Sequence, residues 1–298
     1  MKICFIGGCG HSAQAFRYLQ SRGDVELCGY APGSEHEVTV PKFAATLPYF
    51  ENYQAMLDAC QPDYAVVSPV FGLTASVICD CARRGIHVFS EKPVATTLAD
   101  LQRVEQAVAE SGIRFCAMHY LRYDPAFYLG AQLVDKIGQV QLVTAQKSYK
   151  YGTRPAWYAD PDLYGGTIPW VGIHAIDWIY HFTGKKFLSV TTQKVGEMAA
   201  LCQFALEGGA VAAMNLDYYR PKGAATHGDD RIRLAGTEGV LEVSGGKVTL
   251  ITAEETQVWE PKEAPELLEE FLAGGGIEAQ EIFYLTKVAL VAKEGGTI

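Results

Sequence analysis

The chain has 298 residues, and 49% of them are hydrophobic, which is enough to bury one large core or the cores of two domains. Its formal net charge of -9 disfavours nucleic acids and anionic membranes as partners. No apolar run reaches the ~20 residues that a membrane-spanning helix needs. The short apolar run at the N-terminus is predicted as a strand rather than as a signal peptide.

The eight cysteines are predicted as free thiols. Several lie in apolar runs, where a buried thiol behaves as a small hydrophobic group. Cys79 and Cys81 are separated by a single residue, which is not the spacing of a metal finger. We therefore expect a cytoplasmic protein without a metal site.

Strand and helix signals alternate over the first 120 residues. Strands are predicted at Lys2–Ile6, Val25–Tyr30, Tyr64–Ser68, Ile86–Ser90 and Ile113–Met118. Helices are predicted after the first strand, at Asn52–Cys60, at Thr74–Arg84, and from the capping residue Thr97 to Ser111. This alternation predicts an α/β fold that begins with a doubly wound parallel sheet of the Rossmann type.

The pattern changes after a helix predicted at Asp124–Lys136. Long alternating stretches follow at Gln139–Tyr149, Leu188–Lys194, Ala200–Glu207, Ala210–Tyr218, Arg231–Val243 and Lys247–Trp259. Helices are predicted at Ile173–Thr183, Pro265–Leu272 and Glu278–Lys293. Glycine turns between several stretches predict an open, mostly antiparallel sheet in a C-terminal α+β domain. We expect a dinucleotide-binding domain over 1–121 and a substrate and oligomerisation domain over 122–298, with the substrate in the cleft between them and the last helix packed back on the first domain.

The first strand runs into a G-x-G-x-x-A turn. Gly8 is predicted to permit the tight turn, and Gly10 to let the backbone approach a diphosphate. Ala13 is small enough for the helix to pack on the strand. The N–H groups of this helix end, at His11 and Ser12, suit an anion. The turn therefore predicts a dinucleotide site.

Two further segments carry groups suited to acid–base chemistry. Lys92, in Glu91-Lys92-Pro93, follows the strand that ends at Ser90, and the carboxyl ends of parallel strands line the ligand crevice. His174 and Asp177 are three residues apart on one predicted helix, so they share a face. A surface lysine and a core histidine bonded to Asp177 are the alternatives.

The chain resembles the Gfo/Idh/MocA family, which includes glucose–fructose oxidoreductase and inositol dehydrogenase. The resemblance rests on segments spread along the whole chain. They are the Gly8 turn, Gly85-Ile-His-Val-Phe-Ser-Glu-Lys-Pro93, Arg122-Tyr123-Asp124-Pro125, Trp157 to Asp177 with its Gly172-x-His174-x-x-Asp177 pattern, and Gly236-Thr-Glu-Gly239.

This resemblance implies NAD(P)-dependent hydride transfer on a sugar, a polyol or a related small molecule. Lys92 would hydrogen-bond the reacting oxygen, and His174 would be the second acid–base or orienting group. The cofactor-binding residues would be Gly8, Gly10, His11, Ser12, Ala13, Ser68, Pro69, Glu91 and Lys92. The substrate-binding residues would be Lys92, Tyr120, Arg122, Trp157, Trp170, His174 and Asp177. The resemblance also implies a homodimer or a homotetramer.

Two departures from the family pattern leave alternatives open. Trp170 stands where many members carry an aspartate, and an indole cannot transfer a proton in this chemistry. A transient-redox lyase or epimerase with tightly bound NAD, or a non-catalytic sensor of cofactor or sugar, is therefore an alternative function. No acid precedes Glu35 at the end of the second strand, where an acid normally binds the adenosine ribose. The cofactor is NAD or NADP, and the lack of arginine between Arg22 and Arg83 favours NAD.

Overall fold

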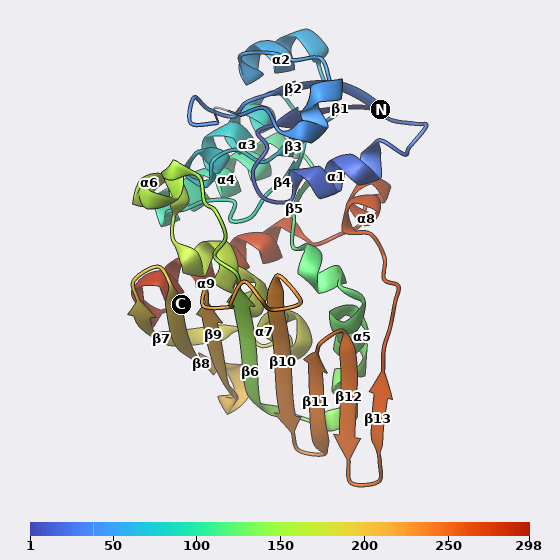
Figure 1. The fold of residues 1–298 in the computed structure, drawn as a ribbon, viewed down its shortest axis with the longest axis vertical. Helices are drawn as coiled ribbons and strands as arrows, with labels where there is room; N and C mark the ends of the chain where they lie inside the picture. The colour runs from blue at the N-terminus through green and yellow to red at the C-terminus, as the bar shows by residue number, and fades with distance from the viewer. Residues whose placement is uncertain (38) are drawn as a thin grey trace. The chain divides into compact units, whose positions relative to one another are not determined.

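The computed structural model describes residues 1–37 and 39–298, and the chain forms two compact units (Figure 1). The first unit contains Met1–Met118, Pro155–Gly165 and Leu267–Thr286. The second contains His119–Arg154, Gly166–Glu266 and Lys287–Ile298. The sequence predicts a single division after residue 121. By its contacts, the first unit also includes two later segments, and α9 (Ala279–Glu294), the last helix, contributes residues to both units.

The first unit is built on a parallel sheet with the strand order β2-β1-β3-β4-β5. Its strands are β1 (Lys2–Ile6), β2 (Glu26–Ala31), β3 (Tyr64–Val67), β4 (His87–Ser90) and β5 (Phe115–Ala117). Its helices are α1 (Ser12–Leu19), α2 (Tyr53–Cys60), α3 (Thr74–Arg83), α4 (Leu98–Ser111), α6 (Pro161–Tyr164) and α8 (Leu267–Ala273). Strand β5 is buried along its whole length, and β1, β3 and β4 are buried at every residue after the first, as strands covered on both faces should be. The predicted doubly wound sheet is confirmed.

Predicted helix ends in this unit are also confirmed. The Thr97 Oγ1 accepts a hydrogen bond from the backbone N–H of Asp100 at 3.1 Å, and this bond caps α4. Gly112 ends the same helix with a φ of +64°, in the left-handed region. A short 3-10 helix at Lys42–Thr46 was not predicted, because five residues are too few to show a helical period.

The second unit contains a mixed sheet with the strand order β13-β12-β11-β10-β6-β9-β8-β7-β14. Only β6 and β9 pair in parallel among the strands described, so the sheet is mostly antiparallel, as predicted. The strands are β6 (Val140–Tyr149), β7 (Phe187–Val195), β8 (Ala199–Leu206), β9 (Val211–Asp217), β10 (Gly228–Gly236), β11 (Gly239–Ser244), β12 (Lys247–Thr252), β13 (Thr256–Trp259) and β14 (Gly296–Thr297). The helices are α5 (Pro125–Leu133), α7 (Ile173–Thr183) and the second half of α9 (Ala279–Glu294).

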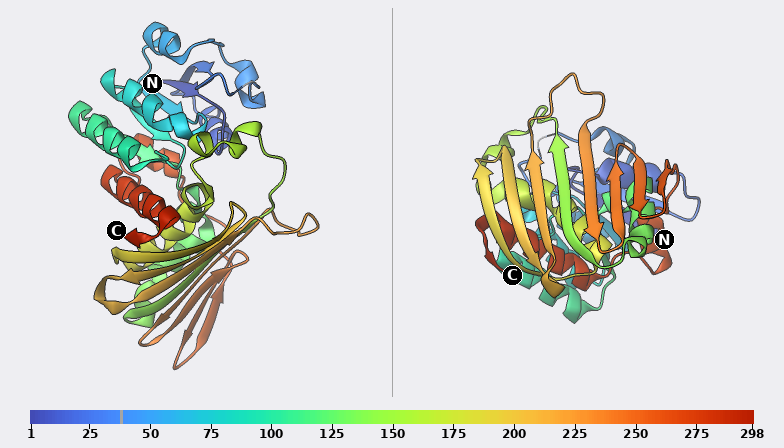
Figure 2. Two further views of the ribbon diagram at one scale, coloured as in Figure 1. Left: turned by 90° about the vertical axis from the view of Figure 1, so that its left-hand side faces the viewer. Right: turned by 90° about the horizontal axis from the view of Figure 1, so that it is seen from below.

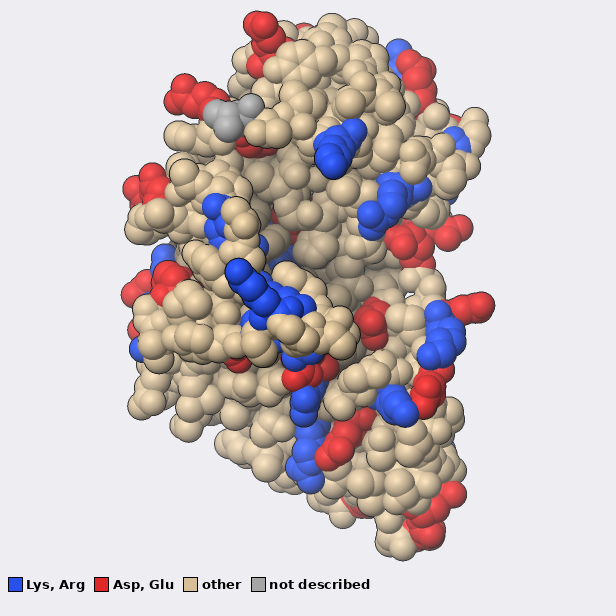
Figure 3. Space-filling model, in the orientation of Figure 1, with Lys and Arg blue, Asp and Glu red and all other residues tan. Residues whose placement is uncertain are grey.

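Two of the predicted alternating stretches each contain the two strands of a hairpin. The stretch Arg231–Val243 divides into β10 and β11, and Lys247–Trp259 divides into β12 and β13. Helices α5 and α7 pack against one face of the sheet, and the alternating burial along β8 and β9 leaves the other face exposed (Figure 2). Acidic and basic side chains are interspersed on the face shown in Figure 3. Among the residues described, no helix is long and apolar enough to span a membrane.

Candidate functional site

The turn between β1 and α1 is held in place by glycines. Gly7 and Gly10 have φ values of +80° and +58°, a region that residues with a Cβ rarely adopt. A Cβ added to Gly8 would lie 2.5 Å from the Cγ of Pro41. Gly7 therefore makes the tight turn that the sequence assigns to Gly8, and Gly8 is required by close packing instead.

Backbone N–H groups at this turn are open to an anion. Those of Gly10, Ser12 and Ala13 have no acceptor within the described part of the chain. The side chain of Ser12 is fully buried, and its Oγ has no hydrogen-bond partner there either. Donors without partners at a helix N-terminus attract phosphate groups. The turn therefore fits the diphosphate of a dinucleotide.

A cavity of about 310 Å³ opens on the turn, within the first unit. Trp157 and Tyr158 form an aromatic part of its wall, with ring centroids 4.2 Å apart. The remaining lining residues are Gly8, Cys9, Gly10, His36, Glu37, Thr39 and Pro155. Trp157, which the sequence predicts to bind substrate, lines this cavity beside the glycine turn.

Glu37 is a residue of this cavity that sequence reasoning missed. Its Oε2 accepts a hydrogen bond from the N–H of Gly8 at 3.1 Å. Its Oε1 accepts hydrogen bonds from the N–H groups of Gly33 and Val70, each at 3.2 Å. Burial raises the pKa of Glu37 to about 7, even though these three N–H groups favour the ionised form.

The end of β4 delivers Glu91 and Lys92. Glu91 is fully buried, and its Oε2 lies 2.5 Å from the backbone N of His11, which donates to it, and 3.0 Å from the His11 Nδ1. Burial acts to raise the pKa of Glu91, but the facing His11 and Lys92 outweigh burial and lower it. Glu91 is thus an anion that braces the glycine turn. Lys92 is 1% exposed, and its backbone N–H donates to the Glu91 Oε1 at 2.9 Å.

The end of β3 is tied to the same turn. The N–H of Cys9 donates to the carbonyl oxygen of Ser68 at 2.9 Å, and the Ser68 hydroxyl donates to the carbonyl oxygen of Cys9. Pro69 follows directly, and a Cβ added to Gly33 would lie 2.3 Å from the Cβ of Pro69. The predicted cofactor residues Ser68, Glu91 and His11 are therefore brought together in the first unit.

Asp177 is the centre of a buried ionic cluster in the second unit. Both side-chain oxygens of Asp177 accept hydrogen bonds from the guanidinium of Arg122, which lies 55 residues earlier. The Nδ1 of His119 lies 3.6 Å from the Asp177 Oδ2, and both side chains are fully buried. Burial acts to raise the pKa of Asp177, but Arg122 and His119 outweigh it and hold the pKa well below its usual range. Asp177 is therefore an ionised carboxylate at neutral pH.

His174 lies in the first turn of α7 and is 1% exposed. A π-helical turn at Ile168–Gly172 leads into this helix and carries Trp170, which is also buried. Tyr120 is buried on the 3-10 helix Tyr120–Tyr123, which also carries Arg122. Burial, with the positive charge of Arg122, lowers the pKa of His181 to about 4.

A buried lysine in the second unit also escaped sequence reasoning. Lys147 on β6 is fully buried, with its Nζ 2.5 Å from the Asp230 Oδ2. The Nζ lies 4.4 Å from the ring centroid of Tyr149 and 5.1 Å from that of Trp178. Burial lowers the pKa of Lys147 to about 8 although Asp230 acts to raise it. The sequence could not show that Lys147 is buried, because a lysine in an alternating strand is normally expected on the exposed face.

Comparisons with known proteins agree with this architecture. The family model described as "Oxidoreductase family, NAD-binding Rossmann fold" matches residues 1–119, and the model of the GFO/IDH/MocA C-terminal domain matches residues 131–242. A protein from Thermotoga maritima, provisionally assigned as an oxidoreductase, is 36% identical, with a TM-score of 0.93 over 100% of both chains. The chain belongs to the GFO/IDH/MocA family of oxidoreductases.

Curated relatives are similar over part of the chain only. A D-xylose 1-dehydrogenase (NADP(+)) of Haloferax volcanii is 28% identical over 137 residues, which is 45% of this chain and 42% of the relative. An inositol 2-dehydrogenase of Salmonella typhimurium is 25% identical over 169 residues, which is 56% of this chain and 48% of the relative. The chain thus spans about half the length of the curated relatives that it matches.

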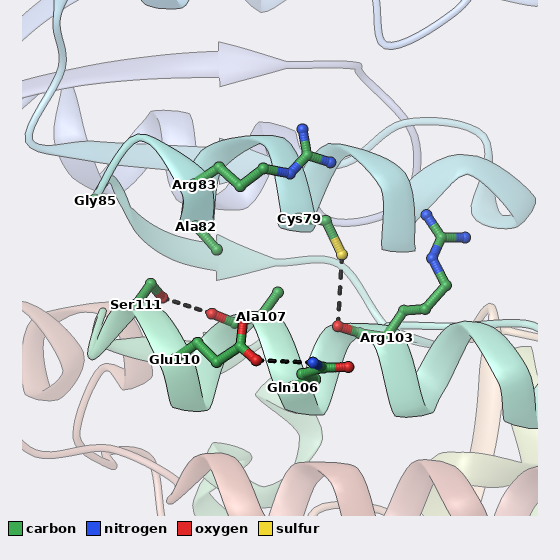
Figure 4. A pocket seen from close by; sticks show the side chains of 9 residues that line it. All are labelled: Cys79, Ala82, Arg83, Gly85, Arg103, Gln106, Ala107, Glu110 and Ser111. Atoms are coloured by element: carbon green, nitrogen blue, oxygen red, sulfur yellow. Dashed lines mark hydrogen bonds between the residues drawn. The ribbon is translucent and has the colours of Figure 1, made fainter.

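A larger cavity in this GFO/IDH/MocA chain, of about 590 Å³, lies elsewhere in the first unit, between α3 and α4 (Figure 4). Its rim includes Arg83 and Arg103, which form ion pairs with aspartates of their own helices. The Cys79 thiol there donates to the carbonyl oxygen of Arg103. None of its lining residues belongs to the glycine turn or to the end of β4, so we do not assign it to the redox chemistry.

Proposed function

We propose that this oxidoreductase transfers hydride between a nicotinamide dinucleotide and a hydroxyl-bearing or ketone carbon of a sugar, polyol or related small molecule. The observation that carries the proposal is the glycine turn. It carries N–H groups without an acceptor in the described part of the chain, its residues Gly8 to Gly10 line a cavity, and its brace, Glu91, precedes the buried Lys92. The names of the two curated dehydrogenases support a sugar or polyol as the substrate class.

The residues present fit the dinucleotide. The N–H groups of Gly10, Ser12 and Ala13 would bind the diphosphate, with the N-terminus of α1 adding a favourable partial charge. When bound, the nicotinamide ring accepts or supplies the hydride. Trp157 belongs with the cofactor residues in this proposal, because it lines the cavity at the glycine turn.

The protein's own contribution to the reaction is proton management at the substrate oxygen. Losing hydride from an alcohol carbon requires its hydroxyl to lose a proton, so a titratable side chain must take that proton. We assign this role to the Lys92 Nζ and a second acid–base or orienting role to His174. Asp177 does not transfer protons in this proposal, because its pKa, lowered by the Arg122 guanidinium, is too low for the carboxylate to take up a proton at neutral pH. Asp177 positions Arg122 instead. Tyr120 and Trp170 are proposed to contact the substrate.

A panel of sugars and polyols, followed by nicotinamide absorbance, tests the proposal. Lys92→Met keeps the length of the side chain but removes its proton-carrying group, so we expect turnover to fall by at least ~100-fold while the cofactor still binds. Lys136→Met, at an exposed position, is the matched control and should keep wild-type turnover. Wild-type turnover by folded Lys92→Met would contradict the proposed role.

We also propose that the chain forms a homodimer or homotetramer through the exposed face of the larger sheet. Leu142 and Val211 are paired across β6 and β9 and are 40% and 49% exposed, and Leu201 on β8 is 43% exposed. Apolar side chains on adjacent strands favour cover by a second copy. Leu201→Lys should lower the molar mass measured by light scattering, and a monomeric wild-type protein would contradict the proposal.

A further inference from the structure

The loop after β2 supplies an acidic group that the strand itself lacks. In many Rossmann domains the residue at the end of the second strand is an Asp or Glu that binds the adenosine ribose. Here β2 ends at Ala31, and the next residue is Pro32. The loop instead returns Glu37 to the glycine turn, where its carboxylate bonds the N–H of Gly8 and lines the cavity.

We propose that Glu37 accepts a hydrogen bond from a hydroxyl of the adenosine ribose and makes this chain select NAD over NADP. The inference rests on the proposed function, because it places the adenosine half of the dinucleotide in the cavity at the glycine turn. It assigns to a loop residue the role of the acid that the end of β2 lacks.

The hydrogen-bonding capacity of the carboxylate permits this role. Two carboxylate oxygens offer about four acceptor positions. The N–H groups of Gly33 and Val70 use two positions on Oε1, and the N–H of Gly8 uses one on Oε2. One acceptor position therefore stays available on Oε2, the oxygen that also accepts the hydrogen bond from the N–H of Gly8. These same bonds hold the side chain in place before any ligand binds, so little entropy is lost on binding.

Charge in the cavity disfavours a 2′-phosphate. A phosphate monoester carries about −1.5 to −2 charges at neutral pH, and an ionised carboxylate repels it. The lining residues that the structure describes include no lysine or arginine to compensate for that charge.

The protonation of Glu37 gives a second consequence. Its pKa of about 7 means that the repelling charge is present above that pH and is lost below it. The titratable groups facing it are Cys9, Tyr30 and His36, and burial raises the pKa of both Cys9 and Tyr30, so those two stay uncharged. Discrimination against NADP should therefore increase as the pH rises through about 7.

Calorimetric titration of the full chain tests the inference without using activity. The probes are NAD⁺, NADP⁺, ADP-ribose and its 2′-phosphate. For the wild-type chain at pH 8 we expect NAD⁺ and ADP-ribose to bind at least about ten times more tightly than their phosphorylated forms. In Glu37→Gln the ratio at pH 8 should fall by about tenfold and should rise less steeply with pH than in the wild-type chain, whereas Glu35→Gln, at an exposed position, should keep the wild-type ratio.

The outcomes separate the inference about Glu37 from the proposed function. A wild-type chain that binds NADP⁺ as tightly as NAD⁺, or a folded Glu37→Gln with an unchanged ratio, overturns the inference and leaves the proposed function standing. Failure of all four probes to bind overturns both. If Glu37 only braces the loop, Glu37→Gln lowers the melting temperature and weakens all four probes equally, and this too overturns the inference. If Glu37→Gln does not fold, the wild-type ratio and its pH dependence still decide the matter.

Discussion

Replacing Asp177 by asparagine should destabilise the second unit severely. The substitution keeps the shape of the side chain but removes the negative charge that faces Arg122. The side chain of Arg122 is 8% exposed, and those of Asp177 and His119 are fully buried, so water cannot replace the lost partner. Removing one member of such a buried pair costs about 3–5 kcal/mol. This is a large part of the about 5–15 kcal/mol that stabilises a typical protein.

Scanning calorimetry and urea unfolding measure this loss. For a domain of this size, about 3–5 kcal/mol corresponds to a fall in melting temperature of roughly 6–20 °C. The matched control is Glu242→Gln, which breaks the ion pair of Glu242 with Arg233 in the same unit. Those side chains are 43% and 45% exposed, so the control should cost no more than about 1 kcal/mol.

Two results would refute this reasoning. The first is an Asp177→Asn variant that is no less stable than Glu242→Gln. The second comes from the double variant Arg122→Met with Asp177→Leu, which removes both charges and should be more stable than Asp177→Asn alone. A double variant that is less stable than Asp177→Asn would mean that packing, rather than charge, explains the loss.

The pH dependence of the same cluster has a definite sign. The pKa of Asp177 is held well below its usual range in the folded chain, so the unfolded chain binds its proton first as the pH falls. The stability that Asp177 contributes is therefore fully present above the unfolded value of about 3.9 and is lost as the pH falls below it. Asp177→Asn should flatten the acid limb of the unfolding curve.

Three further substitutions test the first unit. Gly10→Ala should abolish binding of ADP-ribose, because the added Cβ would lie 2.0 Å from the buried Oε2 of Glu91, and because Gly10 has a φ of +58°. The control is Gly23→Ala, whose Cβ would have no atom within 4 Å, and it should bind ADP-ribose normally. Gly33→Ala should weaken NAD⁺ binding, since its Cβ would lie 2.3 Å from the Cβ of Pro69 and 2.9 Å from the Oε1 of Glu37; unchanged affinity would show that this packing is not needed for binding. Thr97→Ala should lower the free energy of unfolding by about 0.5–2 kcal/mol, and no change would mean that the cap of α4 is dispensable.

The elements of the first unit could be predicted from the sequence because each carries a local signal. The buried run Lys2–Ile6 and the capping residue Thr97 are examples, and both predictions were confirmed. Alternation over Arg231–Val243 did not by itself locate the turn; the segment Gly236-Thr-Glu-Gly239, which joins β10 and β11, was predicted as a hairpin only through the family resemblance. Local periodicity does not report where a strand reverses direction.

The candidate site was predictable only where a motif is continuous. The glycine turn and Glu91-Lys92 were found in this way. Glu37 was missed because its role depends on a loop that folds back, and the sequence showed only that the strand end has no acid. The pairing of Arg122 with Asp177 joins residues 55 positions apart, and no spacing rule connects them.

Isotope transfer tests the central claim most directly. A polyol or sugar deuterated at the carbon to be oxidised is incubated with the enzyme and its preferred dinucleotide, and the reduced nicotinamide is analysed by mass spectrometry. The proposed function predicts that deuterium appears on the nicotinamide ring with wild-type enzyme and is strongly reduced with Lys92→Met. Folded wild-type protein that binds the dinucleotide but transfers no deuterium from any member of the panel would contradict it.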